Sequence, residues 1–341
     1  MKKVRLGLIG FGNVGQGLAQ ILREHGAEYA QAFGLEFRIV GIADARLGCV
    51  VQPQGWAAGQ LLDHVAHTGT LKGLPGEQPG WDALALIREC NADVIVELSY
   101  TDLQTGEPAT THIAEALSRA KHVVTTNKGP VALHYDRLAA LAQTNGVRLG
   151  VEGTVMSGTP VLRLGRELLA PAGIFGVEGI LNGTTNFILT RMETGAPYLE
   201  ALAEAQSLGY AEADPTGDVE GFDAAGKVVI LARLVLGAAL NMADVDRQGI
   251  TRLTPADIEA ARAAGERWKL IGALVVSAGQ VKASVRPTRL PLANPLAGVG
   301  GATNAILFHT HLLGDVTLIG PGAGRLETGT AVIEDLIAIF H

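Results

Sequence analysis

One short segment constrains the fold of this chain more than any other. Residues 4–9 form an apolar run, and helical periodicity begins at Gln16. The residues between them are Gly10, Phe11, Gly12, Asn13, Val14 and Gly15. A GxGxxG turn between a strand and a helix is the setting in which dinucleotides bind, because glycines permit the tight turn, the approach of a pyrophosphate and close helix packing. The amides at the helix N-terminus can also bind phosphate. The segment therefore predicts a Rossmann-type cofactor site.

The next strand predicts how the cofactor is chosen. Residues 37–43 form an apolar strand that ends at Asp44, where a carboxylate can accept hydrogen bonds from an adenine-ribose diol and so favour NAD. Arg46 follows two residues later and can pair with a 2′-phosphate, which favours NADP. The sequence is therefore compatible with both NAD and NADP. We interpret the glycine-rich residues 47–80 as an inserted surface excursion.

Alternating strands and helices continue to residue 151. Strands are predicted at residues 93–98, 122–125 and 148–151. Ligands bind at the carboxyl ends of strands in such sheets, so the residues that follow two of these strands are candidate cofactor contacts. They are Ser99, Thr101 and Lys128. The alternative for Lys128 is a solvent-exposed turn lysine.

The pattern changes after residue 151. Strands are predicted at residues 175–181, 270–276 and 280–285, and Gly183 and Thr184 form a small turn ahead of a helix that suits an anion such as a substrate carboxylate. The fold class is α/β, with a Rossmann-type domain and an α+β catalytic and dimerisation domain built on a mixed sheet. We place the first domain at residues 1–151, completed by residues 318–341 with their closing helix, and the second at residues 152–317.

A cluster of carboxylates precedes one lysine in residues 207–234. The acids are Glu212, Asp214, Asp218, Glu220 and Asp223, and the lysine is Lys227. Asp223 and Lys227 are four residues apart and share one face of a helix whose other faces are apolar. A buried lysine is costly unless it is paired, and perturbed charges grouped in this way favour a functional site. The alternative is an ordinary helix ion pair.

Composition excludes several classes of protein. The chain has 341 residues, of which 48% are hydrophobic, and its net charge is −7 without a basic block. Two domains are expected at this length, and nucleic acid and membranes are excluded as partners. Cys49 and Cys90 fit neither a metal nor a disulfide spacing, and we expect a cytoplasmic protein. The N-terminal apolar run is interrupted by Arg5, so it is not a signal peptide, and no segment is long enough to span a membrane.

Several segments together resemble the homoserine dehydrogenase family. They are GFGNVG, VVTTNKGPVA, EGTVMSGTPV, GILNGTTNFIL, LGYAEADPTGDVEGFDAAGKVVILARL and IGPGAG, and they run from residue 7 to about residue 338. The resemblance implies NAD(P)-dependent interconversion of L-homoserine and L-aspartate 4-semialdehyde in threonine, methionine and isoleucine biosynthesis. It also implies a homodimer. Since nothing follows His341, we expect a short form without a regulatory ACT domain.

The resemblance also implies roles for single residues. Lys128 and Lys227 resemble the two active-site lysines, and Glu212 resembles the substrate-binding glutamate. Asp218 and Asp223 resemble carboxylates that orient the substrate and the lysine, and Gly322 of IGPGAG is a further candidate cofactor contact. A loop that binds a sodium ion in the family, largely through backbone oxygens, corresponds to Glu152, Val155, Ser157 and Thr159.

The residue types fit this chemistry in their own right. Oxidation of an alcohol by nicotinamide needs a base and a group that stabilises an alkoxide-like oxygen, and two lysines can supply both. Two alternatives remain. One is another NAD(P)-dependent oxidoreductase that acts on an amino-acid aldehyde or imine, which need not contain the set from Glu212 to Lys227. The other is a non-catalytic dinucleotide-binding sensor, which has no use for two lysines and clustered acids.

Overall fold

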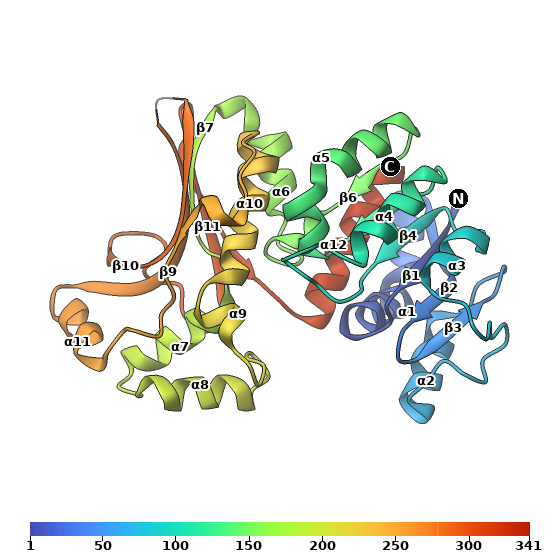
Figure 1. Cartoon of the computed structure of the whole chain (residues 1–341), viewed down its shortest axis with the longest axis horizontal. Coiled ribbons are helices and arrows are strands. Elements are labelled where there is room, and N and C mark those ends of the chain that lie inside the picture. Colours follow the sequence, from blue (N-terminus) through green and yellow to red (C-terminus); the bar gives the residue numbers. More distant parts are fainter. Residues whose placement is uncertain (278) are drawn as a thin grey trace. The chain divides into compact units, whose positions relative to one another are not determined.

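The chain forms two compact units. The computed structural model describes residues 1–277 and 279–341. Unit 1 comprises Met1–Gly158 and Gly324–His341, and unit 2 comprises Thr159–Ala323. The colours of Figure 1 show the same division, because the red C-terminal helix α12 lies among the blue and green elements of unit 1. The unit boundaries differ by a few residues from the predicted domain boundaries: residues 152–158 belong to unit 1 and residues 318–323 to unit 2.

Unit 1 contains a six-stranded sheet with the order β3-β2-β1-β4-β5-β6. The strands are β1 (Lys2–Ile9), β2 (Leu35–Asp44), β3 (Gly48–Val51), β4 (Val94–Glu97), β5 (His122–Thr125) and β6 (Leu149–Gly150). All neighbours are parallel except β2 and β3, which are antiparallel. The direction in which the strands are added reverses beside β1. In a doubly wound sheet the ligand crevice lies at that position, outside the carboxyl ends of the strands.

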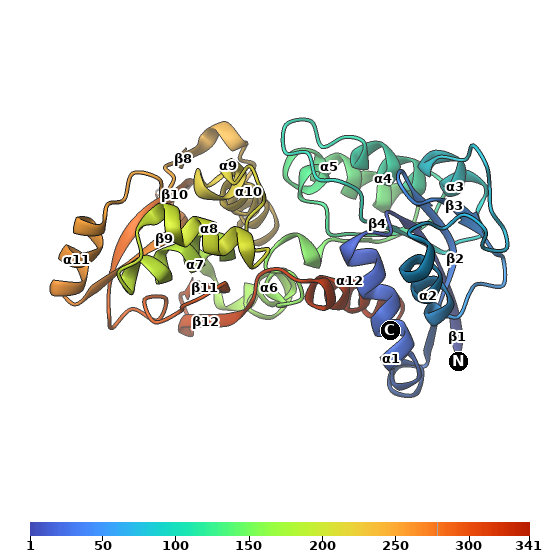
Figure 2. The ribbon, with the colours of Figure 1, turned by 90° about the horizontal axis from the view of Figure 1, so that it is seen from below.

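Helices cover both faces of this sheet (Figure 2). They are α1 (Asn13–Phe33), α2 (Ala58–Thr68), α3 (Ala83–Glu89), α4 (Ala109–Ser118), α5 (Lys128–Thr144), the short η1 (Glu152–Thr154) and α12 (Arg325–Phe340). Alternate residues of β4 point to opposite faces. Val94 and Val96 join one core with α1, α2 and α12, whereas Ile95 joins a second core with α3, α4 and α5. The predicted Rossmann-type fold is confirmed.

The interpretation of residues 47–80 as a surface excursion is wrong in part. β3 pairs with the edge of the sheet, and Val50, Trp56 and Leu61 are buried in the same core as α1. Glycines and prolines interrupt the hydrophobic periodicity of this segment, so the sequence did not show that its apolar residues join the core.

Unit 2 contains a second six-stranded sheet, with the order β12-β11-β7-β9-β10-β8. The strands are β7 (Ile174–Ile180), β8 (Val245–Arg247), β9 (Glu266–Ser277), β10 (Gln280–Pro291), β11 (Thr303–Thr310) and β12 (Gly314–Pro321). The pair of β8 and β10 is parallel and the other pairs are antiparallel, so the predicted mixed sheet is confirmed. The sequence analysis did not predict the hairpin of β11 and β12.

One long helix dominates the helical side of unit 2. The helices are α6 (Val161–Arg163), η2 (Leu164–Leu168), η3 (Ala170–Ala172), α7 (Gly183–Glu193), α8 (Tyr198–Ser207), α9 (Thr216–Val219), α10 (Phe222–Leu236), η4 (Met242–Asp244) and α11 (Pro255–Ala263). α10 is buried over most of its length and packs closely on β9, where a Cβ atom at Gly272 would lie 2.8 Å from Val228. Among the described residues, no helix is long and apolar enough to cross a membrane.

Candidate active site

The carboxyl end of β7 and the start of α10 meet at one side chain, Asn182. Asn182 caps α7, since its Oδ1 accepts a hydrogen bond from the Thr185 amide at 2.9 Å. Its Nδ2 donates to Asp218 Oδ1 at 2.7 Å and to Asp223 Oδ2 at 3.0 Å. One amide therefore ties the N-terminus of α7 to two of the predicted carboxylates.

Lys227 joins the same cluster from one turn along α10. Its Nζ lies 2.9 Å from Asp223 Oδ2 and donates to the carbonyl oxygen of Leu181 at 2.6 Å. The residue is only 6% exposed. A lysine this deeply buried needs such partners. The structure thus brings together Lys227, Asp223 and Asp218, which the sequence analysis singled out, around an asparagine that it did not.

Two carboxylates lie close together in this cluster. Burial raises the pKa of Asp218, and the nearby charge of Asp223 raises it further. Hydrogen bonds from Asn182 and Thr184 and the charge of Lys227 act in the opposite direction. The cluster therefore contains one carboxylate whose ionised form is disfavoured, which is the kind of perturbation that active sites show.

Three further predicted substrate contacts are Gly183 and Thr184, which begin α7, and Glu212. Thr184 is in the first turn of α7, where its hydroxyl donates to the carbonyl oxygen of Tyr210 at 2.5 Å. Glu212 is exposed in the irregular segment between α8 and α9. Among the described residues, its carboxylate makes no hydrogen bond or ion pair to the protein. Glu212 is thus the accessible anion of the set.

The glycine turn after β1 has the geometry of a phosphate site. Gly10 has a φ of +95°, and a Cβ atom there would lie 2.7 Å from the Leu98 carbonyl oxygen. A Cβ atom at Gly15 would lie 2.8 Å from the Gly10 carbonyl oxygen. At Gly12, in contrast, a Cβ atom would meet nothing within 4 Å. The protein's own packing requires two of these glycines, while the third leaves open space beside the N-terminus of α1. The residues present fit a dinucleotide.

Asp44 is held rigidly beside this turn. Its Oδ2 accepts from the Phe11 amide at 2.8 Å, and its Oδ1 accepts from the amides of Arg46 at 2.9 Å and Leu47 at 3.0 Å. The backbone therefore fixes the carboxylate at the end of β2. The Arg46 side chain lies on the surface.

The remaining predicted residues of unit 1 follow β4 and β5. Lys128 is the first residue of α5, and Ser99 and Thr101 lie in the loop after β4. Lys128 lies in unit 1 and Lys227 in unit 2.

Models of two protein domains match the chain. The model for homoserine dehydrogenase matches residues 160–337, and the model for the NAD-binding domain of homoserine dehydrogenase matches residues 10–152. An NAD(+)-dependent homoserine dehydrogenase from Pseudomonas canavaninivorans is 50% identical, over 100% of this chain and 97% of its own length. The chain belongs to the homoserine dehydrogenase family. Its members are NAD(P)-dependent oxidoreductases.

Solved structures of this family have the same fold. A homoserine dehydrogenase from Thiobacillus denitrificans has a TM-score of 0.86 and 36% identity, covering 100% of this chain and 74% of that one. A hyperthermophilic archaeal homoserine dehydrogenase mutant in complex with NADPH has a TM-score of 0.85 and 33% identity, covering 99% of this chain and 98% of that one. The predicted function as an NAD(P)-dependent homoserine dehydrogenase is confirmed, and neither alternative is supported.

The loop of this chain that is predicted to bind a sodium ion turns sharply. Glu152 is buried, its amide donates to Asp335 Oδ2 at 2.9 Å, and Met156 and Ser157 have φ values of +55° and +54°. The Ser157 hydroxyl lies 2.8 Å from the Thr328 hydroxyl. Among the described residues, no group of three His, Cys, Asp or Glu side chains could hold a metal ion. A cation here would need backbone and hydroxyl oxygens.

The other two predicted positions near this loop already have protein contacts. The Thr159 hydroxyl donates to the Pro321 carbonyl oxygen at 3.0 Å. A Cβ atom at Gly322 would lie 2.1 Å from the Asn304 side chain, so packing within unit 2 accounts for this glycine.

Two polar residues escaped the sequence analysis. Asn182 directly precedes a helix, and asparagine is preferred at that capping position, so the signal was present. Glu97 is a carboxylate at the end of the apolar run DVIVEL, and a charge in a strand expected to be buried is also a signal.

Proposed function

We propose that the residues of both units carry out the interconversion of L-homoserine and L-aspartate 4-semialdehyde in amino-acid biosynthesis. The glycine turn of residues 10–15 would hold the pyrophosphate of the cofactor, and Asp44 would hold its adenine ribose. Ser99, Thr101 and Gly322 are further proposed cofactor contacts. When bound, the cofactor accepts a hydride from the alcohol carbon of homoserine or returns it to the aldehyde.

The observation that supports this assignment best is the ion pair of Lys227 with Asp223 at 2.9 Å. A second contact, the hydrogen bond to the Leu181 carbonyl oxygen, holds the same Nζ atom in place. We therefore assign to Lys227 the stabilisation of the alkoxide-like oxygen, and to Lys128 the transfer of the hydroxyl proton. Asp223 holds the Lys227 ammonium, and Asn182 holds Asp218 and Asp223 in place.

The substrate's two charged groups need opposite partners. Glu212 is exposed and would bind the ammonium group. The N-terminus of α7, at Gly183 and Thr184, presents backbone amides and the positive end of a helix to the carboxylate. This arrangement would hold homoserine by both ends with residues of unit 2 alone.

A monovalent cation, a dimer and a compartment complete the proposal. Sodium at Glu152, Val155, Ser157 and Thr159 is supported by the sharp turn at Met156 and by a donor set of oxygen atoms alone. A homodimer through unit 2 is supported by apolar side chains that are exposed on the sheet of this unit, such as Val275 and Ile319. A cytoplasmic location is supported by Cys49 and Cys90, which are both free thiols, as is usual in a reducing compartment.

A spectrophotometric assay tests the proposal. Purified full-length protein should reduce NAD or NADP only when L-homoserine is present, and should oxidise the reduced cofactor with the semialdehyde. Absence of turnover with both cofactors, in protein shown to bind them, would contradict the assigned reaction.

A further inference from the structure

A carboxylate lies inside the cofactor-binding sheet without a role in the proposed function. Glu97 is the last residue of β4 and is 0% exposed. Its strand lies between β1 and β5. A carboxylate at such a depth is retained only where several donors satisfy it.

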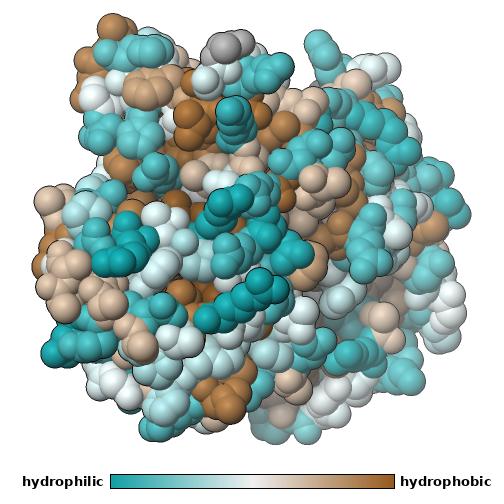
Figure 3. All heavy atoms as spheres, turned by 60° about the vertical axis from the view of Figure 1, so that its left-hand side comes forward, coloured by the Kyte–Doolittle hydropathy of each residue, from teal (hydrophilic) through white to brown (hydrophobic). Residues whose placement is uncertain are grey.

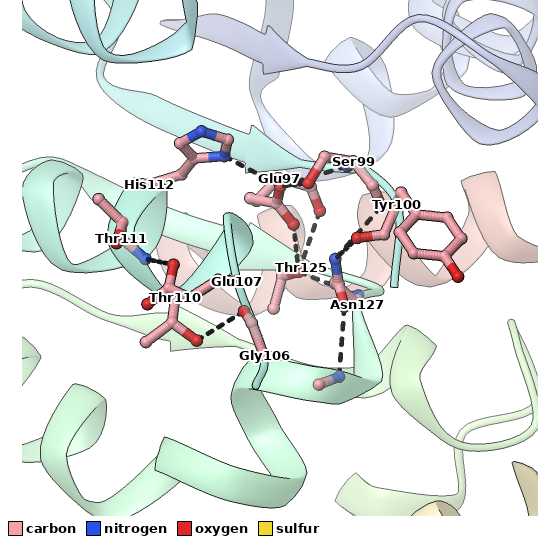
Figure 4. A network of polar contacts seen from close by, with 11 residues as sticks. Glu97, Ser99, Tyr100, Gly106, Glu107, Thr110, Thr111, His112, Thr125 and Asn127 are labelled. Atoms are coloured by element: carbon pink, nitrogen blue, oxygen red, sulfur yellow. Dashed lines mark hydrogen bonds and ion pairs between the residues drawn. The ribbon is translucent and has the colours of Figure 1, made fainter. Parts of the chain in front are cut away.

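Those donors come from three neighbouring elements (Figure 4). Glu97 Oε1 accepts from the amide of Ser99 at 3.2 Å and from its hydroxyl, and it lies 3.4 Å from His112 Nδ1 of α4. The hydroxyl of Thr125, at the end of β5, donates to the Glu97 carbonyl oxygen at 3.0 Å and lies 3.4 Å from Oε2. Both carboxylate oxygens are therefore used as acceptors.

The same contacts close into a ring through Asn127. The Asn127 amide donates to the Thr125 hydroxyl at 3.0 Å, and Asn127 Nδ2 donates to the carbonyl oxygens of Ser99 at 3.2 Å and Tyr100 at 3.0 Å. Asn127 is also the N-cap of α5, whose first residue is Lys128. The ring thus joins the loop after β4 to the loop that carries the proposed base.

We propose that Glu97 is a positioning residue for the reaction, whose buried carboxylate fixes Ser99 directly and Lys128 through Thr125 and Asn127. A carboxylate suits this place because all the groups that converge on it can donate hydrogen bonds, and an ionised acceptor strengthens each one. The inference rests on the proposed roles of Ser99 and Lys128. It adds that their placement depends on one acid beneath them.

Glu97→Gln in the full-length enzyme is the test. The amide has nearly the same shape but offers one acceptor and a donor that opposes Ser99 or Thr125. We expect kcat to fall about 10- to 100-fold, since a misplacement near 1 Å has an effect of that order. The KM for the cofactor should rise about three- to tenfold with the loosened Ser99 loop, and the KM for homoserine should change little, because its proposed contacts lie in unit 2.

The same strand offers a matched control. Asp93 precedes the opposite end of β4 and pairs with Arg5 at 2.5 Å. Asp93→Asn should lower thermal stability yet leave kcat and both KM values unchanged per folded molecule. If Asp93→Asn reproduces the kinetic losses of Glu97→Gln, or if Glu97→Gln stays within about twofold of the wild type, the positioning role is wrong.

A second variant keeps the proposal testable if Glu97→Gln does not fold. Thr125→Val keeps the shape and removes the hydroxyl that links Glu97 to Asn127, so it should lower kcat in the same direction. Unchanged kinetics in Thr125→Val would overturn the proposal even if Glu97→Gln cannot be purified. Lys128→Ala separates the two levels of inference. If this variant keeps wild-type turnover, the proposed role of Lys128 in proton transfer is wrong, whereas a silent Glu97→Gln beside an inactive Lys128→Ala refutes the positioning role alone.

Discussion

Lys227 combines deep burial with an ion pair to Asp223. Because it stabilises the reacting oxygen in the proposed function, Lys227→Ala should lower kcat by about two to four decades. Cofactor affinity should barely change. Glu212→Ala should act differently and raise the KM for homoserine more than it lowers kcat, since it removes a ground-state ion pair. Steady-state kinetics of the two variants side by side measure this contrast.

Unit 2 contains a second buried lysine that serves as a control. Lys269 is 0% exposed and its Nζ lies 3.6 Å from Glu193. Lys269→Met should change the melting temperature without changing kcat. If Lys227→Ala keeps near-normal turnover, the pair of Asp223 and Lys227 has only a structural role. Lys128 is then the next candidate for the catalytic lysine.

The charge of Asp218 is expected to lower the stability of the fold although the proposed reaction needs it. A pKa raised by burial and by Asp223 means that the folded protein holds this proton more tightly than the unfolded chain does. The ionised carboxylate therefore lowers stability in full above that pKa, and the loss shrinks as the pH falls through it toward the ordinary pKa of an aspartate. Asp218→Asn keeps an acceptor for Asn182 and removes the repulsion.

We expect Asp218→Asn to raise the melting temperature by about 1–3 °C at neutral pH, to lower kcat, and to lose its stability advantage in acid. Thermal unfolding at several pH values provides the measurement. A melting temperature lower than that of the wild type at neutral pH would show that the charge of Asp218 is instead satisfied in the folded state.

Arg46 predicts how the two cofactors are distinguished. Three backbone amides hold Asp44 in place, so it cannot turn away from a 2′-phosphate, and the nearby guanidinium offers the compensating charge. Arg46→Ala should weaken NADPH binding about tenfold and leave NADH binding unchanged. Calorimetric titration with each cofactor tests this, and equal losses for both would exclude contact between Arg46 and the 2′ position.

In the turn between β1 and α1, one glycine is needed for the packing of the protein and another leaves room for the cofactor. A side chain at Gly12 meets only open space in the protein, whereas one at Gly10 meets the Leu98 carbonyl oxygen. Gly12→Val should therefore keep the wild-type melting temperature and abolish detectable cofactor binding. Gly10→Val, as the matched control, should unfold unit 1 at lower temperature. Unchanged affinity in Gly12→Val would remove the turn from the cofactor site.

The same comparison shows which elements the sequence could predict. The turn was predictable because strand, glycines and helix are adjacent in the chain and meet local requirements. The role of Asn182 was not, because its partners Asp218 and Asp223 are 36 and 41 residues away. Glu97 was missed for the same reason, since beside the neighbouring Ser99 its partners are His112 of α4 and Thr125 of β5. Long-range polar contacts, rather than periodicity, were the missing information.

Unit 2 exposes apolar side chains on its sheet, and these predict the quaternary structure. Val275 of β9 is 47% exposed and Ile319 of β12 is 54% exposed. Figure 3, in which the side of Figure 1 that carries unit 2 comes forward, shows apolar patches among polar ones. Such patches are typical of protein interfaces. Light scattering should therefore give twice the mass of one chain.

A charged variant tests which surface forms the dimer. Val275→Asp combined with Ile319→Asp should reduce the mass to that of one chain, because buried unpaired carboxylates oppose association. Leu199→Asp, on α8 and away from the sheet, should leave the dimer intact; Leu199 is 75% exposed. A wild-type mass of one chain at every concentration would contradict the prediction.

The return of residues 324–341 to unit 1 affects how the protein is made. α12 packs so closely on α1 that a Cβ atom at Gly17 would lie 2.2 Å from the Arg325 carbonyl oxygen, and Val332, Ile333 and Leu336 belong to the core beside β4. A ribosome synthesises α1 before unit 2 and α12 after it, so the face of α1 that α12 covers stays uncovered while all of unit 2 emerges. Unit 2 lies inside the sequence of unit 1 and can fold during translation. The core beneath the cofactor site can be completed only after the codons for α12 have been read.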